Sequence, residues 1–238
     1  MSGYNGKFLK VEEVPYNGKI YEIVEMKAAV CVLVLNNKKD KLLLVKQYRP
    51  VVKGFTLEIP AGMMDVEGED PVSCILRELK EEANLNIDRN SVKLLASYCP
   101  IIGSVRHFTQ MFVAVYDGKT ENIAIKDDDV IERVWVSFNA FEKLVEFGEI
   151  IDAKTLLAYS LYRSKQQAKE NKLNLVEDLK AYDEAIRIIS GKKVCSVCNN
   201  EISGIHFVNK VNFMKVCEHC SKTLNVEPGK NNWKMNFN

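Results

Sequence analysis

The chain has 238 residues, 47% of them hydrophobic, and its 33 basic and 32 acidic side chains leave a formal net charge of +1. This length predicts one or two globular domains with enough apolar residues to form a core. So balanced a charge argues against a broad nucleic-acid-binding surface, and the longest clear apolar run, residues 28–35, is too short to span a bilayer.

The N-terminal part of the chain predicts strands. Its first ten residues, MSGYNGKFLK, show no apolar export segment, so we expect a cytoplasmic protein with reduced thiols. Two strand-like runs, FLKVEEV and KIYEIVEM, then flank the turn signal PYNGK. The next apolar runs, AAVCVLVL and KLLLVKQY, predict two buried strands joined by a polar turn.

Residues 71–83 predict one amphipathic helix. Asp70 and Pro71 are typical of an N-cap and a first helical residue, and Asn84 can adopt the left-handed conformation that ends a helix. The buried stripe has the i, i+3, i+4, i+7 spacing and consists of Val72, Ile75, Leu76, Leu79 and Ala83. Three glutamates share the opposite side of this helix: Glu78, Glu81 and Glu82.

The glutamate cluster has two interpretations. It can be a solvated charged face, because like charges four residues apart cost only about 0.2–0.5 kcal/mol when exposed. It can also be a site for a hard divalent cation, since proteins hold Mg²⁺ with a few carboxylates together with substrate phosphates. The helix alone does not decide between them.

The rest of the chain predicts further strands and helices. Strands are expected at 92–98, 108–116 and 132–138, and helices at 138–150, 152–167 and 174–190, the last ending at Gly191.

Two CxxC pairs in the last segment predict a zinc site. The pairs are separated by eighteen residues and comprise Cys195, Cys198, Cys217 and Cys220. Four thiolates at such spacing can complete a tetrahedron around a structural Zn²⁺, and the segment resembles a zinc ribbon. The alternatives are four unrelated thiols or, less readily without export, disulfides. We expect Cys31, Cys74 and Cys99 to be core residues.

The stretch LEIPAGMMDVEGEDPVSCILRELKEEANL, residues 57–85, resembles the signature of the Nudix hydrolase family. The matching residues are Gly62, Glu69, Arg77, Glu78, Leu79, Glu81, Glu82 and Leu85. The chain departs from the family in two places: six residues, where five are usual, separate Gly62 from Glu69, and Asn84 replaces a glycine. An extra loop residue is readily accommodated, and asparagine is the usual substitute at a helix end.

Three more motifs resemble the ADP-ribose pyrophosphatase branch of this family: LLLVKQYRP, LEIPAG and GEIIDAKTL, together with Pro100. The resemblance implies an α/β (α+β) fold, a Nudix α/β/α sandwich with a mixed sheet, followed here by the small zinc ribbon. The expected domains are 1–165, with strands in 1–26 that help to form a homodimer, a connecting helix at 166–191, and the ribbon at 192–238.

The resemblance also implies roles for individual residues. Glu78, Glu81 and Glu82 would hold Mg²⁺ or Mn²⁺ together with the Ala61 carbonyl, as catalytic residues that Arg77 orients. Glu69 would support the loop. Substrate binding would involve Arg49, whose fork suits a phosphate but can equally form a surface salt bridge, and Glu58, which can bind metal or brace Arg49.

The general base is harder to place. Some relatives carry a glutamate in the loop after the signature, but PIIGSVRHF has no acid, and Val105 or His107 takes that position. A later loop offers Asp127, Asp128, Asp129 and Glu132, of which we favour Asp129. The same run can be a solvated acidic turn.

The resemblance and these residues together imply a Mg²⁺-dependent hydrolase that cleaves the pyrophosphate of a nucleoside diphosphate sugar. The family branch makes ADP-ribose the first candidate, with GDP-mannose or another nucleotide sugar as alternatives. The alternative is a non-catalytic nucleotide-sugar sensor whose ribbon contacts a protein or nucleic acid. A sensor could lose its glutamates without penalty, and all three are present, which favours the enzyme.

Overall fold

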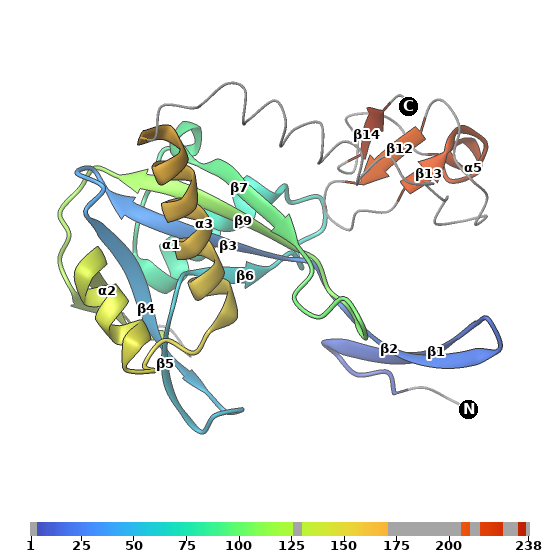
Figure 1. Ribbon diagram of the computed structural model, residues 1–238, viewed down its shortest axis with the longest axis horizontal. Helices are drawn as coiled ribbons and strands as arrows, with labels where there is room; N and C mark the ends of the chain where they lie inside the picture. The colour runs from blue at the N-terminus through green and yellow to red at the C-terminus, as the bar shows by residue number, and fades with distance from the viewer. Residues whose placement is uncertain (1–3, 126–129, 171–205, 210–214, 226–232, 237–238) are drawn as a thin grey trace. The chain divides into compact units, whose positions relative to one another are not determined.

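The computed structural model describes residues 4–125, 130–170, 206–209, 215–225 and 233–236 (Figure 1). The chain divides into two compact units, Met1–Arg163 and Ser164–Asn238, and each is described by itself. Several expectations lie outside the described residues: the helix at 174–190, the pair Cys195 and Cys198, and the acidic residues Asp127, Asp128 and Asp129. None of the helices in the described ranges is long and apolar enough to cross a membrane.

The first unit is built on an eight-stranded sheet in the order β10-β11-β4-β3-β9-β7, with β5 paired to β4 and β6 paired to β3. Strands β3 and β9 run parallel and the other pairs antiparallel, so the sheet is mixed, as expected. The strands are β3 (Ala29–Asn36), β4 (Lys41–Arg49), β5 (Gly54–Glu58), β6 (Ala61–Met63), β7 (Lys93–Tyr98), β9 (Thr109–Tyr116), β10 (Ile123–Ala124) and β11 (Val130–Ser137).

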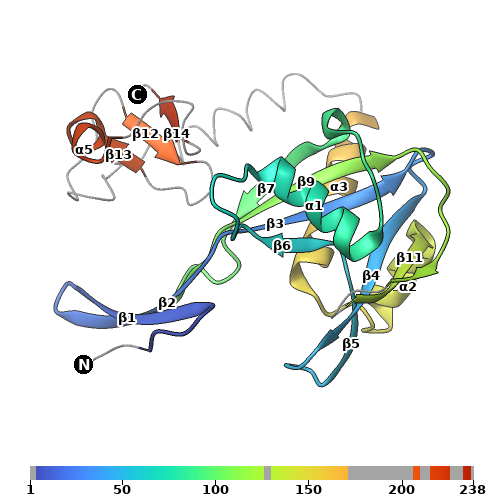
Figure 2. The same ribbon diagram turned by 180° about the vertical axis from the view of Figure 1, so that it is seen from behind.

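Helices cover both faces of this sheet. Helix α3 (Ala153–Glu170) lies over the face turned to the viewer in Figure 1, and α1 (Pro71–Ala83) lies over the face seen in Figure 2. Helix α2 (Phe138–Glu146) lies on the α3 side, where its Phe141 joins the same core as Ala158. A short 3-10 helix, η1 (Arg89–Ser91), precedes β7.

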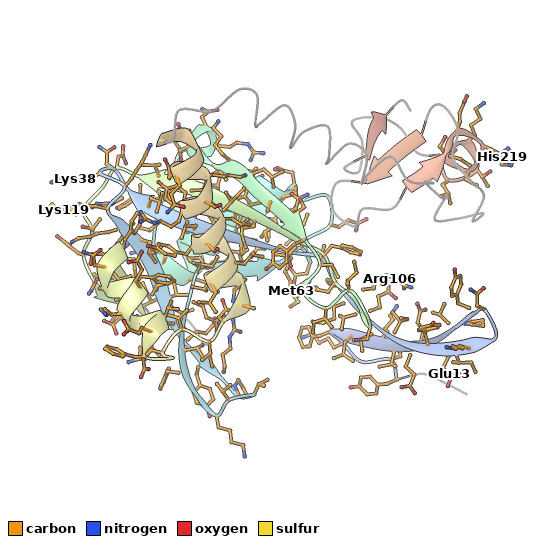
Figure 3. The ribbon with its side chains drawn as sticks, viewed as in Figure 1. Glu13, Lys38, Met63, Arg106, Lys119 and His219 are labelled. Atoms are coloured by element: carbon orange, nitrogen blue, oxygen red, sulfur yellow. The ribbon has the colours of Figure 1, made fainter. Side chains whose placement is uncertain are left out.

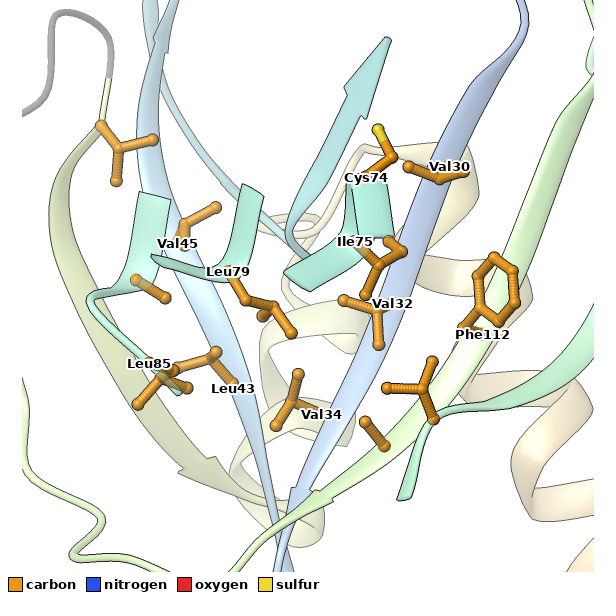
Figure 4. Packing of buried hydrophobic residues seen from close by; sticks show 14 of the residues in the cluster. Val30, Val32, Val34, Leu43, Val45, Cys74, Ile75, Leu79, Leu85 and Phe112 are labelled. Carbon is orange, nitrogen blue, oxygen red and sulfur yellow. The ribbon is translucent and has the colours of Figure 1, made fainter. Parts of the chain in front are cut away.

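The alternation of β3 explains the two cores. Successive side chains of a strand point to opposite faces, so Val30, Val32 and Val34 pack with α1, whereas Cys31, Leu33 and Leu35 pack with α2 and α3. Figure 4 shows Ile75 and Leu79 of α1 facing the sheet, and both are fully buried. Burying each such side chain contributes about 1.5–3 kcal/mol.

The ends of α1 confirm the prediction for residues 71–83. The Asp70 carboxylate accepts hydrogen bonds from the backbone N–H groups of Val72 and Ser73, at 3.0 and 3.3 Å. Asn84 has φ 49° and ψ 44°, and its N–H bonds to carbonyls of the last turn. The asparagine therefore takes the left-handed conformation that glycine most often supplies at the end of a helix.

Other boundaries differ from the prediction. The helix expected at 138–150 ends at Glu146, because Gly148 takes φ +75° and leads the chain out of the helix. Helix α3 extends to Glu170, beyond the expected end at 167. Strands β5, β6, β8 and β10 were not predicted; three of them have only two or three residues, too few to show an alternation.

A second sheet contains β1 (Leu9–Tyr16), β2 (Lys19–Met26) and β8 (Val105–Arg106). Strands β1 and β2 form the expected hairpin, and its turn residues Asn17 and Gly18 have φ 51° and 74°, as a tight hairpin turn requires. Arg106, labelled in Figure 3 with the hairpin residue Glu13, forms an ion pair with Glu12 at 2.6 Å. The segment between β7 and β9 is thus attached to the N-terminal hairpin.

The second unit contains a three-stranded antiparallel sheet in the order β13-β12-β14. Its elements are β12 (His206–Asn209), β13 (Lys215–Cys217), α5 (Glu218–Thr223) and β14 (Trp233–Asn236). Cys217 precedes α5 as its N-cap residue, and Cys220 is buried one turn later.

Candidate active site

Glu82 connects α1 to the sheet. Its carboxylate accepts a hydrogen bond of 3.0 Å from the backbone N–H of Ala61, the first residue of β6. The residue is only 8% exposed, so it does not belong to a solvated face. Glu81 does, with half of its side chain exposed. The three glutamates therefore occupy different environments, although they share one side of the helix.

Gly62 lies against Glu78. A Cβ atom built on Gly62 would come within 2.0 Å of the Glu78 carboxyl carbon, which is far inside van der Waals contact. With Glu78 in its place between α1 and β6, the short strand that ends at Met63 in Figure 3, a side chain at residue 62 would force the end of the glutamate to move. The glycine thus allows Glu78 to keep this position.

Replacing Gly62 with alanine tests this contact. At the divalent-cation site that the sequence predicts, we expect Gly62→Ala to displace Glu78 and to weaken cation binding at least about tenfold, the range for lost support of a metal ligand. Calorimetric titration with Mn²⁺ measures the affinity. The control is Gly103→Ala, because a Cβ at Gly103 meets no atom within 4 Å. Equal Mn²⁺ affinity of both variants would contradict the packing argument.

Arg77 ties three glutamates together. Its guanidinium bonds both carboxylate oxygens of Glu69 at 3.1 and 3.2 Å. It also reaches Glu78 at 2.7 Å and Glu81 at 3.0 Å. Hydrogen bonding to Glu69 is the main cause that raises the pKa of Arg77, so the cation is permanent. The arginine fixes the loop before the helix and the carboxylates on it.

The carboxylates of Glu78 and Glu82 have too little positive charge nearby to offset their burial. Burial, with the neighbouring Glu78 carboxylate adding to it, raises the pKa of Glu82 to about 8. Burial likewise raises the pKa of Glu78, although Arg77 opposes that shift. In the described ranges no three His, Cys, Asp or Glu side chains are gathered as a metal cluster. A divalent cation would supply the missing positive charge, and carboxylate oxygens are the hard ligands that such a cation prefers.

A second charged group surrounds Glu58, at the end of β5. Arg49 donates two hydrogen bonds to its carboxylate, at 2.7 and 2.6 Å. Lys154 and the Thr56 hydroxyl also donate to it. Burial by itself would raise the pKa of Glu58, but the bonds from Arg49 and Lys154 outweigh it and lower the pKa to about 2. Both oxygens of Glu58 are therefore engaged by the protein.

Asp152, Lys154 and Thr155 hold α3 to this group, and the sequence alone predicted no role for them. Lys154 also pairs with Asp152 at 3.0 Å. The Thr155 hydroxyl accepts a 2.9 Å hydrogen bond from the Ile59 backbone N–H, which joins the first turn of α3 to the turn before Ala61. The motif GEIIDAKTL contained the signal for these contacts, but their partners lie far away in the sequence.

A cavity of about 520 Å³ lies beside the first turn of α3 and borders both groups. It is lined by Ala29, Val30, Ala61, Tyr98, Cys99, Pro100, His107, Thr109, Asp152, Ala153, Lys154 and Leu157. Ala61 brings it next to Glu82, and Lys154 brings it next to Glu58.

The general-base candidates are separated in the structure. Val105 pairs with Val24 in the small sheet, whereas His107 lines the cavity. Glu132 lies on β11, paired across from Lys46 of β4. Asp129, the favoured candidate, is not among the residues described, so its position is not compared with theirs.

Comparison with known proteins gives consistent matches. A family model for the NUDIX domain matches residues 25–158. The ADP-ribose pyrophosphatase of Bacillus subtilis (strain 168) is 33% identical over 71% of this chain and 92% of its own length. The methanol dehydrogenase activator of Bacillus methanolicus is 30% identical over the same two shares. The GDP-mannose pyrophosphatase of Yersinia pestis (strain Pestoides F) is 29% identical over 63% and 77%.

The fold also matches a solved structure. The crystal structure of an ADP compounds hydrolase aligns with a TM-score of 0.55 at 20% sequence identity, over 71% of this chain and 92% of that chain. This likeness supports the fold.

Proposed function

The chain belongs to the Nudix family, and from this premise we propose that it hydrolyses the pyrophosphate bond of a nucleoside diphosphate sugar with Mg²⁺ or Mn²⁺. The first candidate is ADP-ribose, which would yield AMP and ribose 5-phosphate. The observation that carries the proposal is the glutamate helix, whose Glu82 is bonded to Ala61 at the border of the cavity. Two relatives with pyrophosphatase names support the substrate class.

The catalytic part of the proposal rests on α1. Nudix hydrolases generally use a divalent metal such as Mg²⁺. We assign the metal to Glu78, Glu81 and Glu82 with the Ala61 carbonyl, because the first and last of these carboxylates have raised pKa values that a cation would relieve. When bound, such a metal neutralises pyrophosphate and makes water easier to deprotonate. Arg77 would keep the carboxylates in place.

Arg49 and Glu58 are proposed to bind substrate together. Glu58 occupies Nε and Nη2 of Arg49, which leaves Nη1 of this half-exposed guanidinium for a phosphate oxygen. Because both oxygens of Glu58 are engaged, the bracing role suits it better than metal binding. Asp129 remains our proposal for the general base, on the sequence argument alone.

Product analysis tests the proposed reaction. Incubation of ADP-ribose with the protein and Mg²⁺ should give AMP and ribose 5-phosphate, because water attacks one phosphorus and the bridging oxygen leaves with the other. In ¹⁸O-labelled water, mass spectrometry should find one labelled atom in one of the two products. GDP-mannose, run in parallel, tests the second substrate. Release of free phosphate or of intact ADP would refute the proposed bond.

The sensor remains a second candidate because of two observations. The unit Ser164–Asn238 lies beyond the residues matched by the family model, and one relative is named as an activator of another enzyme. Tight binding of a nucleotide sugar without turnover in the presence of Mg²⁺ would favour the sensor. The retained glutamates favour the enzyme.

We propose that the four cysteines of the C-terminal segment bind one structural Zn²⁺. Thiolates are soft ligands that select Zn²⁺, while carboxylates and carbonyls suit Mg²⁺, so the two metals would occupy separate sites. The proposal rests on the spacing of Cys195, Cys198, Cys217 and Cys220. The ribbon would serve as a metal-stapled cap, since so small a segment cannot bury a sufficient core by itself.

Metal analysis of the purified protein should therefore find one zinc per chain, with Zn–S distances of about 2.3 Å by X-ray absorption. The double variant Cys198→Ser, Cys220→Ser should lose the zinc, and the control Cys99→Ser should keep it. A chain truncated after Gly191 should retain hydrolysis if the ribbon is only a cap. A zinc-free protein with four titratable thiols would rule the site out.

The domain limits, the oligomeric state and the location are also proposed from the sequence. We propose the domain limits 1–165, 166–191 and 192–238, a homodimer formed through residues 1–26, and a cytoplasmic location. Exposed apolar side chains of the hairpin, Tyr16, Ile20 and Tyr21, support the dimer. Light scattering of a chain that lacks the first 26 residues tests it.

A further inference from the structure

A hydrogen bond from α3 holds the turn between β5 and β6. The backbone N–H of Ile59, in this turn, donates to the Thr155 hydroxyl at 2.9 Å, across 96 positions of the chain. Two residues later, the Ala61 N–H donates to the Glu82 carboxylate of α1 at 3.0 Å. Because α1 and α3 cover opposite faces of the sheet, this turn connects a helix without a role in metal binding to the helix to which we assign the metal.

The two partners of the Thr155 hydroxyl fix the direction of its hydrogen bonds. The hydroxyl donates its single proton to the Asp152 carboxylate, which also accepts from the Thr155 backbone N–H at 3.0 Å. An amide N–H only donates, so Ile59 must use a lone pair of the same hydroxyl oxygen. Thr155 is fully buried and Ile59 is only 1% exposed, so bulk water does not reach this bond.

Pro60 makes the bond at Ile59 important for the position of Ala61. A proline has no backbone N–H and a fixed φ, so Ile59 supplies the last amide donor before Ala61. The peptide unit that follows Pro60 is held on both sides, because its carbonyl accepts from the Val32 N–H at 3.0 Å and its N–H donates to Glu82. A shift of the backbone at Ile59 would pass through the rigid proline to the peptide unit that contacts Glu82.

We propose that Thr155 is a positioning residue for the metal site, and that its hydroxyl fixes the turn where Ala61 meets Glu82. The inference rests on the function proposed above, which assigns the Glu82 carboxylate and the Ala61 carbonyl to a divalent cation. Thr155 would touch neither the metal nor the substrate, since it is buried and its hydroxyl is used by Ile59 and Asp152. Loss of this hydroxyl should therefore weaken metal binding indirectly, through the backbone.

The neighbouring Lys154 holds a different part of the site. It pairs with Glu58, which in turn accepts two hydrogen bonds from Arg49. The first turn of α3 thus contacts the proposed substrate-binding group through one residue and the turn before Ala61 through the next. Because a change of Thr155 keeps Lys154 and Glu58, it should affect the metal more than the substrate.

The variant Thr155→Val tests the inference, because it keeps the shape of the side chain and removes the acceptor of the Ile59 N–H. Calorimetric titration with Mn²⁺ should give a dissociation constant about tenfold higher than in the wild type, the lower end of the range for lost support of a metal ligand. The rescue variant Thr155→Ser keeps the hydroxyl and should bind Mn²⁺ within about twofold of the wild type.

Kinetics and hydrogen exchange provide two further measurements. The Mg²⁺ concentration that gives half the maximal rate should also rise about tenfold, while KM for ADP-ribose at saturating Mg²⁺ stays within about twofold. In the metal-free protein, the amides of Ile59 and Ala61 should exchange with solvent faster in Thr155→Val than in Thr155→Ser. A role confined to overall stability would not divide the metal and substrate constants in this way.

Two other variants separate positioning from folding. Phe141→Leu removes part of a fully buried ring on α2, in the same core as Ala158 of α3, and should lower the melting temperature without changing the Mn²⁺ affinity. Thr155→Cys has a weaker acceptor of similar size and takes the place of Thr155→Val if that protein does not fold. Its Mn²⁺ affinity should lie clearly below that of Thr155→Ser.

The outcomes separate this inference from the proposed function. Unchanged Mn²⁺ affinity in a folded Thr155→Val or Thr155→Cys protein overturns the positioning role and leaves the enzyme standing. An equal loss of affinity in Phe141→Leu overturns it too, because the loss would then follow from lower stability alone. A wild-type protein that binds no Mn²⁺ refutes both proposals. Binding of Mn²⁺ that Thr155→Val weakens, without hydrolysis of any nucleotide sugar, refutes the enzyme and keeps the positioning role.

Discussion

Replacing Glu82 with glutamine should lower kcat at least about a hundredfold, the loss seen when a group that stabilises transition-state charge is removed. Glu82 is 8% exposed and already accepts from the Ala61 N–H, so the glutamine fits the space. What it removes is one negative charge next to Glu78, where we place the metal. Steady-state kinetics with ADP-ribose and saturating Mg²⁺ measure the change.

The control for this variant is Glu146→Gln, on the exposed side of α2, where Glu146 pairs with Lys143. Its kcat should equal that of the wild type. A folded Glu82→Gln protein with near-normal turnover would exclude Glu82 as a metal ligand.

Replacing Glu58 with glutamine should lower the free energy of unfolding by about 2–3 kcal/mol. Removing one partner of a buried ion pair costs about 3–5 kcal/mol because the other charge is left uncompensated. The expected value is smaller here, since 41% of the Arg49 side chain is exposed and water can partly replace its partner. Lys154, with 17% of its side chain exposed, is the more severely affected cation.

Denaturant unfolding at neutral pH measures this effect. The exposed pair of Lys143 and Glu146 supplies the comparison, since about two-thirds of each side chain is accessible to solvent. Surface pairs contribute about 0–1 kcal/mol, so Glu146→Gln should unfold almost like the wild type. Equal unfolding of the two variants would show that the group around Glu58 contributes nothing to stability.

The charge of Glu58 also matters for the proposed substrate site. Glu58 has its pKa lowered to about 2, so it stays ionised and keeps Arg49 in place throughout the neutral range. Its contribution to stability is present above the ordinary glutamate pKa and is lost as the pH falls towards 2. Loss of activity in mild alkali or mild acid should therefore have another origin.

The sequence by itself determined the glutamate helix and its limits. Asp70, Pro71 and Asn84 mark the ends of α1 through local backbone chemistry, which depends only on neighbouring residues. The continuous apolar run of β3 likewise determined a strand buried on both faces. The signature residues pointed to the Nudix family, which the family match confirms.

Only the tertiary structure decided the environment of each charged residue. Helical spacing puts Glu81 and Glu82 on one side of α1, but contact with β6 buries Glu82 and leaves Glu81 exposed. The bond between Ala61 and Glu82 spans 21 positions, and that between Glu58 and Lys154 spans 96. Periodicity shows which face of an element is buried. It does not show which element covers that face, because packing of distant segments fixes those partners.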